Sequence, residues 1–523
     1  MWSAGILVSA ALTAAASVLL VYWVIPAADY WISLVVVASL PLLVVGFWVI
    51  QSSRVGTLVL LLLCLPLGRL TLAEVVSPVT VLAVVALAVW LWRVLAGSER
   101  IEFSYMQLPL TIFLLCGIAA IYGALDVGIA VKILIIFVMG ASVYLVASQT
   151  VRSLDEMQAV LWAGAVAVGI IGLYTAVTSM IGGVSSVQAS AGGGSYDRAA
   201  ELFGSPNLLG GFLALGIPPI VALAASENLW WRRLSGYVLV IAAIVGLAFT
   251  YSRGAWIGTA VSLLVLLPVL KRGRLVLGLA LMAAIVTTAG NVLVRVQSVA
   301  VPARDSAFTS RLEIWATALK LVAEHPFFGV GLGNFQFAYG NLLIPDLPLL
   351  AYTLVVPEGA HDLFLNLAVE VGLVGASAFA WLLAVAFLRA WQARRFADRR
   401  VKIWSAGLAA GLVALLIHTT VDVVIYQGFV AILLFTYLGI LDALRWLDGG
   451  PAGYEHTLPR AASALTTHGV QKKTSNAAYS NRTQDAGAHI RYWSGSENVT
   501  CYPNGNLSET PGFSTAHSEH FRG

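Results

Sequence analysis

Long runs of apolar residues, separated by short polar connections, make up most of this sequence. Many of the runs reach about 18 residues, the length at which an apolar helix can cross a lipid bilayer. We count roughly fourteen runs and interpret each as a membrane-spanning helix. Their approximate limits are residues 5–27, 31–50, 54–71, 77–95, 109–126, 128–150, 157–180, 207–225, 235–252, 254–270, 275–294, 362–388, 403–424 and 427–446. The pattern predicts an all-α polytopic membrane protein with about 12–14 transmembrane helices, because a helix satisfies its own backbone groups inside the membrane.

One segment between these runs has a different pattern. Ser310 and Glu313 match the S-x-x-E capping box, which predicts that a helix begins there. Its apolar face is expected to consist of residues at helical spacing: Leu312, Trp315, Leu319 and Val322. Pro326 should end the helix, and three glycines predict a flexible turn after it: Gly329, Gly331 and Gly333. An amphipathic helix that leads toward a later span suggests a site at a membrane surface, although a helix that only packs on the bundle would have the same pattern.

Composition supports a membrane protein. Hydrophobic residues make up 59% of the chain and charged residues only 11%, whereas soluble domains have roughly 25% charged residues. The formal net charge of +4 arises mostly in loops, so no nucleic-acid partner is expected. The cysteines have neither the spacing of a disulfide framework nor that of a metal site: Cys64, Cys116 and Cys501.

The basic residues of the connecting loops indicate how the chain is oriented. Arginines and lysines concentrate in loops on one side of the predicted spans: Arg54, Arg93, Arg100, Arg152, Arg232, Arg233, 271–274 and 394–402. The positive-inside rule assigns this side to the cytoplasm, and the long loops 181–206 and 295–361 to the extracytoplasmic side. We expect residues 1–446 to form a transmembrane domain. Residues 447–523, rich in Ser, Thr, Asn and Gly, are expected to form a disordered cytoplasmic tail.

Three arginines on the predicted extracytoplasmic side are candidates for binding an anion. Arg253 lies where one span ends and the next begins, and an ionisable residue so close to hydrocarbon is a functional candidate. The alternative for Arg253 is a side chain that snorkels to the interface. Arg311 lies off the apolar stripe of the helix described above. Arg198 either joins the same site or pairs with Glu201 on a surface.

A histidine at the start of a later span is the candidate for catalysis. His361 precedes polar residues that continue at helical spacing: Asp362, Asn366 and Glu370. A polar stripe of this kind in a membrane span should face the interior of the bundle. A neutral imidazole here can act as a general base, with Asp362 or Glu358 next in line. The alternative is an interfacial histidine satisfied by backbone groups.

A second polar pair lies in a later span. His418 and Asp422 are four residues apart, so they share a helix face near the same side of the membrane. They either support the His361 site or tie helices together, and we favour the second role.

The candidate arginines and His361 together suggest which kind of substrate the site binds. A guanidinium group binds two phosphate oxygens at once, so Arg253 and Arg311 with a base at His361 fit a substrate that leaves as a diphosphate. The sequence has no phosphate-binding loop, nucleotide fingerprint or metal-ligand spacing, so neither a cofactor nor a metal ion is expected. A donor that carries its own activated bond, such as a lipid diphosphate-linked sugar, meets these conditions.

These residues fall in segments that resemble the O-antigen ligase and O-antigen polymerase superfamily of bacterial envelopes. The resemblance covers about residues 195–440 and is carried by four segments: Arg198–Asn207 (R-A-A-E-L-F-G-S-P-N), Tyr251–Trp256 (Y-S-R-G-A-W), Arg311–Phe335 and His361–Gly375. It implies a multi-spanning glycosyltransferase fold in the bacterial inner membrane, with the active site facing the periplasm. The chain departs from the family at Asp362, where the family often has asparagine.

The resemblance also implies an activity. Members of the family transfer a glycan from undecaprenyl diphosphate to an acceptor lipid, glycan or protein, without metal or nucleotide. Arg253 and Arg311, with Arg198 as a further candidate, would bind the diphosphate, and His361 would be catalytic. A polysaccharide or lipid transporter (a flippase) is the alternative. Transporters often have repeated halves with broken spans, and we see no such repeat in the sequence.

Overall fold

The computed structural model describes residues 53–67, 77–181, 186–191, 194–199, 204–268, 306–343 and 359–447. Three predicted spans lie outside the described residues: 5–27, 31–50 and 275–294. Glu358 and residues 448–523, nearly all of the predicted tail, lie outside them too. The chain divides into two compact units, Met1–Leu458 and Pro459–Gly523, and every described residue belongs to the first.

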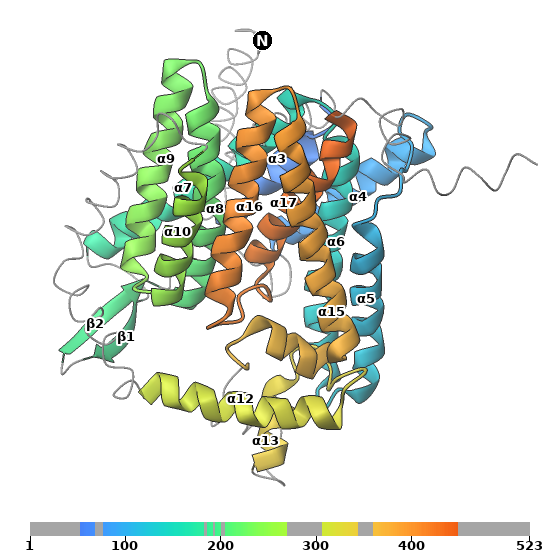
Figure 1. Ribbon diagram of the computed structural model, residues 1–523, viewed down its shortest axis with the longest axis vertical. Coiled ribbons are helices and arrows are strands. Elements are labelled where there is room, and N and C mark those ends of the chain that lie inside the picture. Colours follow the sequence, from blue (N-terminus) through green and yellow to red (C-terminus); the bar gives the residue numbers. More distant parts are fainter. Residues whose placement is uncertain are drawn as a thin grey trace, which may run out of the picture. The chain divides into compact units, whose positions relative to one another are not determined.

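The described residues form a bundle of helices that run side by side (Figure 1). Its helices are α3 (Gly56–Leu63), α4 (Pro78–Leu95), α5 (Gln107–Ala120), α6 (Val127–Thr150), α7 (Leu154–Met180), α8 (Pro206–Ser226), α9 (Trp230–Phe249), α10 (Arg253–Leu266), α15 (Leu363–Gln392), α16 (Arg399–Thr419) and α17 (Gly428–Leu447). Short 3-10 turns follow three of them: η1 (Leu65–Leu67), η2 (Ile121–Gly123) and η5 (Ala393–Arg395).

Eight of the described helices are long and apolar enough to cross a membrane, and α5 and α10 are shorter apolar helices. Each predicted span that falls on described residues contains a helix. The prediction of an all-α polytopic membrane protein is therefore confirmed. The total of 12–14 spans remains a prediction.

A short β-hairpin lies between α7 and α8, where the sequence predicted only a loop. Strand β1 (Ser186–Ala191) pairs antiparallel with β2 (Gly194–Ala199), and Arg198 lies opposite Val187. The alternation of small and polar residues in these strands was too weak to predict them against a long apolar background.

Small residues let the helices of the bundle approach closely. Helix α8 is buried along nearly its whole length, and α16, α9 and α7 lie against it. Where α7 crosses α9, a Cβ at Gly172 would lie 2.5 Å from the Cα of Ala243. Such close backbone contact gives membrane helices the van der Waals packing that holds them together.

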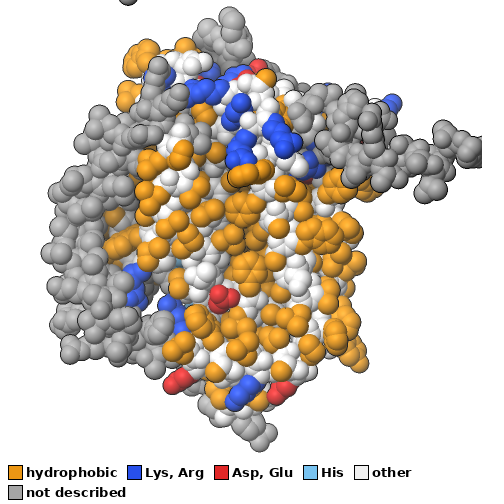
Figure 2. All heavy atoms as spheres, viewed as in Figure 1, with side chains coloured by type: hydrophobic (Ala, Val, Ile, Leu, Met, Phe, Trp, Pro, Cys, Tyr) orange, Lys and Arg blue, Asp and Glu red, His pale blue; other side chains and the backbone are white. Residues whose placement is uncertain are grey.

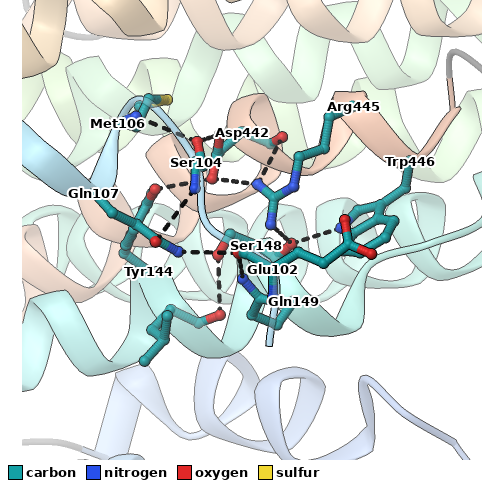
Figure 3. A network of polar contacts seen from close by, with 11 residues as sticks. Glu102, Ser104, Met106, Gln107, Tyr144, Ser148, Gln149, Asp442, Arg445 and Trp446 are labelled. Atoms are coloured by element: carbon teal, nitrogen blue, oxygen red, sulfur yellow. Dashed lines mark hydrogen bonds and ion pairs between the residues drawn. The ribbon is translucent and has the colours of Figure 1, made fainter. Parts of the chain in front are cut away.

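One end of the bundle is tied by buried polar groups, which we call the Asp442 network: Ser104, Tyr144, Ser148, Asp442 and Arg445 (Figure 3). The Asp442 carboxylate accepts hydrogen bonds from Ser104 Oγ and Tyr144 Oη and forms an ion pair with Arg445. Arg445 also donates to the Ser148 carbonyl over 3.2 Å. The network joins the connection before α5 to the ends of α6 and α17. Basic side chains gather at the same end of the bundle, and hydrophobic side chains cover the middle (Figure 2).

Helix α12 (Ser306–Glu324) crosses the opposite end of the bundle, and α13 (Phe335–Leu343) follows it (Figure 1). It begins at Ser306, so the capping-box prediction of a start at Ser310 is wrong, because Ser306 to Thr309 continue the same helix. The expected end before Pro326 is confirmed.

The apolar stripe predicted for α12 coincides only in part with its packed face, because Trp315 and Val322 pack on buried residues of the bundle. Its buried side consists of Ile314, Thr317, Ala318 and Leu321, whereas Leu312 and Leu319 are exposed. The helix has apolar residues around more than half of its circumference, so helical spacing alone did not decide which of them pack on the bundle.

Helix α15 is broken at Gly372, which has φ 73° and ψ 173°. The glycine-containing turn after α12 fills the break. Val330 N and Gly331 N donate to the carbonyls of Val369 and Glu370, and Leu373 N donates to the carbonyl of Pro326. A Cβ at Gly372 would overlap the carbonyl of Phe327, so this close approach requires glycine. The turn, predicted to be flexible, is thus largely buried and held by hydrogen bonds.

Candidate functional site

His361 lies just before α15 in a backbone conformation that is rare for its residue type. Its φ is +52°, in the left-handed region, where a non-glycine residue costs of order 1–3 kcal/mol. Its side chain is 34% exposed, and its Nδ1 lies 3.6 Å from Asp422 Oδ1. This arrangement leaves Nε2 on the far edge of the ring. His361 is therefore held near a carboxylate while about one-third of its side chain stays exposed.

Asp422 lies in the connection between α16 and α17. Burial acts to raise the pKa of its carboxyl, but the neighbouring His361 and His418 and a hydrogen bond from Val423 N outweigh burial, so its pKa is lowered. A carboxylate that stays ionised beside an imidazole can fix the orientation of the ring. Asp422 thus lies beside His361, which favours the first of the two roles considered for it, and that role stays a prediction.

His418 does tie helices together. It is buried in α16, and its Nε2 donates to the carbonyl of Asn207 at the start of α8, over 3.0 Å. The start of α10 also lies against His418: a Cβ added at Gly254 would be only 2.8 Å from His418 Nδ1. Arg311, on α12, lies within electrostatic range of His418. The starts of α8 and α10 therefore meet at His418, and Arg311 acts on it electrostatically.

Arg253 is the first residue of α10, and it is half-buried. A helix N-terminus carries a partial positive charge, so a guanidinium there gains from a nearby anion. The preceding turn is strained at Tyr251, which is buried and has φ +48°. Tyr251 and His361 are the two non-glycine residues with left-handed φ in the described part of the chain. Strain of this kind often accompanies functional sites.

We call the residues at this end of the bundle the His361 cluster: His361, His418 and Asp422, with Arg311 within electrostatic range of His418 and Arg253 next to Gly254 in the chain. Basic side chains are visible again toward this end of the bundle (Figure 2). Arg198 lies on strand β2, and its side chain is outside the description. Glu358 lies outside the described residues. Neither can be placed in the cluster, and their roles remain predictions.

The polar stripe after His361 has separate structural functions. Asp362 caps α15, since its Oδ1 accepts from Leu365 N over 2.8 Å. Asn366 accepts from Ala360 N over 2.9 Å and donates to Tyr426 Oη over 3.1 Å. Asn366 and Glu370 face the interior, as predicted.

Glu370 is the most connected of these residues. Its carboxylate accepts from Gly333 N over 2.8 Å, from Phe335 N over 3.3 Å and from Tyr426 Oη. The turn, α13 and the connection that carries Asp422 are therefore joined at one buried side chain. Tyr426 was missed by the sequence analysis, and the only signal for it was that a buried Glu370 needs a hydrogen-bond donor.

The cluster offers a base and guanidinium groups rather than a metal site. In the residues that the structure describes, no group of three or more His, Cys, Asp or Glu side chains is arranged to hold a metal ion. A half-exposed imidazole backed by a carboxylate can accept a proton. Arginines at the same end of the bundle can bind an anion.

Comparison with protein families gives a match for the region that holds most of this cluster. Residues 238–380 match the family model described as O-Antigen ligase. The match includes Arg253, Arg311 and His361, whereas Arg198 and Asp422 lie outside it. No match was found among curated proteins. This part of the chain, residues 238–380, is thus similar to the O-antigen ligase family, in agreement with the resemblance carried by its sequence segments.

Proposed function

We propose that this protein is a glycosyltransferase of the bacterial inner membrane. It transfers a glycan from an undecaprenyl diphosphate-linked donor to an acceptor lipid, glycan or protein at the periplasmic face. The observation that carries the proposal is His361: a strained, partly exposed imidazole 3.6 Å from a half-buried carboxylate, at the same end of the bundle as Arg311 and the start of α10. The periplasmic orientation is supported by the basic side chains at the opposite end.

The proposed reaction is a direct displacement at the anomeric carbon. The acceptor O–H loses its proton to Nε2 of His361, and its oxygen forms the new bond to the sugar. The bond between the anomeric carbon and the diphosphate oxygen breaks, and the electron pair leaves with the diphosphate. Arg253 and Arg311, with Arg198 as a further candidate, stabilise the negative charge that develops there. No metal ion or cofactor is required for this step.

Asp422 and Glu370 support the reaction without contacting substrate. Asp422 orients the ring of His361 and stabilises its protonated form. Although 3.6 Å is longer than a normal hydrogen bond, such contacts often shorten when substrate binds. Glu370 holds the first part of α15, which carries His361, to the connection that carries Asp422.

The alternative function is transport of a polysaccharide or lipid. The break in α15 is a feature that transporters often have. However, its free backbone groups are hydrogen-bonded to the turn at residues 326–331, so they are not available to a coupling ion. We therefore favour transfer over transport.

Donor binding and transfer, measured separately, test the proposal. Full-length protein in lipid vesicles is given a lipid diphosphate-linked glycan, with or without an acceptor. We expect Arg311→Ala to lose donor binding, and His361→Ala to bind donor but lose transfer. Glu324→Gln, which changes an exposed residue at the end of α12, should do neither. If His361→Gln keeps full activity while His361→Ala loses donor binding as badly as Arg311→Ala, the base lies elsewhere.

Ligase and polymerase differ in their acceptor, which the described residues do not identify. Deletion of the gene separates the two. Loss of long surface chains with intact lipid-linked polymer indicates a ligase. Accumulation of single lipid-linked repeats indicates a polymerase.

A further inference from the structure

Helix α12 has three sides of different character. One side, with Ile314, Ala318 and Leu321, packs on the protein. A second side is polar and exposed: Glu313, Lys320 and Glu324. Between them lies an apolar side that the described residues leave uncovered, where Leu312 is 48% and Leu319 is 61% exposed. An exposed apolar side next to a polar one is typical of a helix that lies in a membrane interface.

The apolar side continues into the turn that follows α12. Phe327 and Phe328 are 67% and 61% exposed, although the residues after them are buried. The turn is fixed rather than free to rearrange, because Pro326 accepts a hydrogen bond from Leu373 N over 2.8 Å. Two adjacent phenylalanines held rigidly outward therefore need a nonpolar environment.

The break in α15 shows where the membrane boundary lies. Its second part, Leu373–Gln392, has about 20 residues, which corresponds to about 30 Å and equals the hydrocarbon thickness of a typical bilayer. Leu373 and Val374, at the start of this part, are exposed apolar residues on a membrane-spanning helix. The turn that carries the two phenylalanines lies at the level of Leu373, because the carbonyl of Pro326 accepts a hydrogen bond from Leu373 N. Helix α12 runs across the end of the bundle there rather than along the spanning helices (Figure 1).

We infer that α12 is an interfacial helix: Leu312, Leu319, Phe327 and Phe328 insert into the lipid leaflet at this end of the bundle, at the boundary of headgroups and acyl chains. The occupant of this surface is membrane lipid, because the surface continues the lipid-facing side of α15. Lys320 and the two glutamates remain in water. The lipid contact does not rest on the reaction proposed above. The insertion of α12 into the interface fixes Arg311 at the depth of the headgroups, the level at which a lipid diphosphate would lie.

Spin labels on neighbouring residues of α12 test this inference. In the full-length chain, Cys64, Cys116 and Cys501 are replaced by alanine, and a single cysteine is introduced at Leu319 or at Lys320. The two positions are about 100° apart around the helix. The labelled proteins are reconstituted in vesicles of phosphatidylethanolamine and phosphatidylglycerol. Collision rates with oxygen, which partitions into lipid, and with a water-soluble nickel chelate are then measured.

We expect the label at Leu319 to collide more with oxygen and less with the nickel chelate than the label at Lys320, and a label at Val374 to behave like the one at Leu319. Equal exposure of Leu319 and Lys320 to the chelate would overturn the inference. Shielding of Leu319 that appears only after a lipid-linked donor is added would also overturn it, since the occupant would then be the donor. A label at Phe327 repeats the measurement at a second position.

Discussion

Two polar clusters lie at opposite ends of the same bundle, and they differ in how completely their carboxylates are paired. In the Asp442 network, a fully buried carboxylate has three side-chain donors: Ser104, Tyr144 and Arg445. In the His361 cluster, the histidine is partly exposed, its carboxylate is 3.6 Å away, and its backbone is strained. A closed network holds helices together, whereas an open one can bind something else. Burial and charge alone do not distinguish a structural cluster from a functional one, whereas the pairing of its carboxylate does.

The largest expected effect is on the open side of this comparison. His361→Ala should lower transfer by about 10²–10⁴-fold, because a general base is removed. Its thermal unfolding midpoint should change little, since the side chain is partly exposed and its contact with Asp422 is 3.6 Å long. Turnover of a lipid-linked donor and thermal unfolding in detergent measure the two quantities. A fall in the midpoint with unchanged turnover would reverse the assignment of the two clusters.

The Asp442 network should show the opposite result. Asp442→Ala leaves the Arg445 guanidinium buried without its carboxylate, which typically costs about 3–5 kcal/mol of stability. The amount of folded protein and its unfolding midpoint should fall, while turnover per folded molecule should stay close to that of the wild type. Loss of turnover in the folded fraction would mean that this network takes part in function.

Arginine replacements test the anion-binding part of the open cluster. Arg253→Lys and Arg311→Lys keep the charge but lose the planar fork that binds two phosphate oxygens. We expect each to lower turnover by about 10²–10³-fold, the usual loss when a group that stabilises developing charge is removed. Membrane insertion should be unchanged. Turnover near the wild-type value in both variants would favour snorkelling arginines.

Asp422→Asn should lower turnover by about 100-fold, because it removes the group that orients His361. The pKa of Asp422 is lowered in the folded protein, so its ionised form adds stability above its unfolded pKa, and that stability is lost only as pH falls through the folded value, below about pH 4. An acidic loss of wild-type activity at higher pH therefore belongs to another group. A full pH–rate profile for both proteins would show whether Asp422 is responsible.

Asp398→Asn is the smallest change and serves as the matched control for Asp442. Asp398 forms an ion pair with Arg400, and about one-third of each side chain is exposed. Losing this ion pair should cost less than about 1 kcal/mol, and asparagine can still cap α16. Unfolding midpoints of the two aspartate variants, measured side by side, compare an exposed pair with a buried one. Similar losses for both would contradict the contrast drawn here.

Local patterns predicted the parts of this fold that depend on neighbours in sequence. The spans, the end of α12 before Pro326 and the inward direction of Asn366 and Glu370 all follow from composition and helical spacing. The packed side of α12 did not follow, because the pattern offers two apolar sides and only the bundle decides between them. The contact of His361 with Asp422 joins residues far apart in the chain, and no local signal specifies such a pair.

The break in α15 has a consequence for how the protein is made. The part of α15 that spans the membrane can insert as soon as it leaves the ribosome, because a run of its length is stable there alone. The preceding part, which leads from His361, reaches its place only when Tyr426 has been synthesised and Glu370 and Asn366 can bind it. A chain truncated before Tyr426 should therefore insert α15 but lack an ordered His361. The connection between α16 and α17, which is translated after α15, thus completes the site.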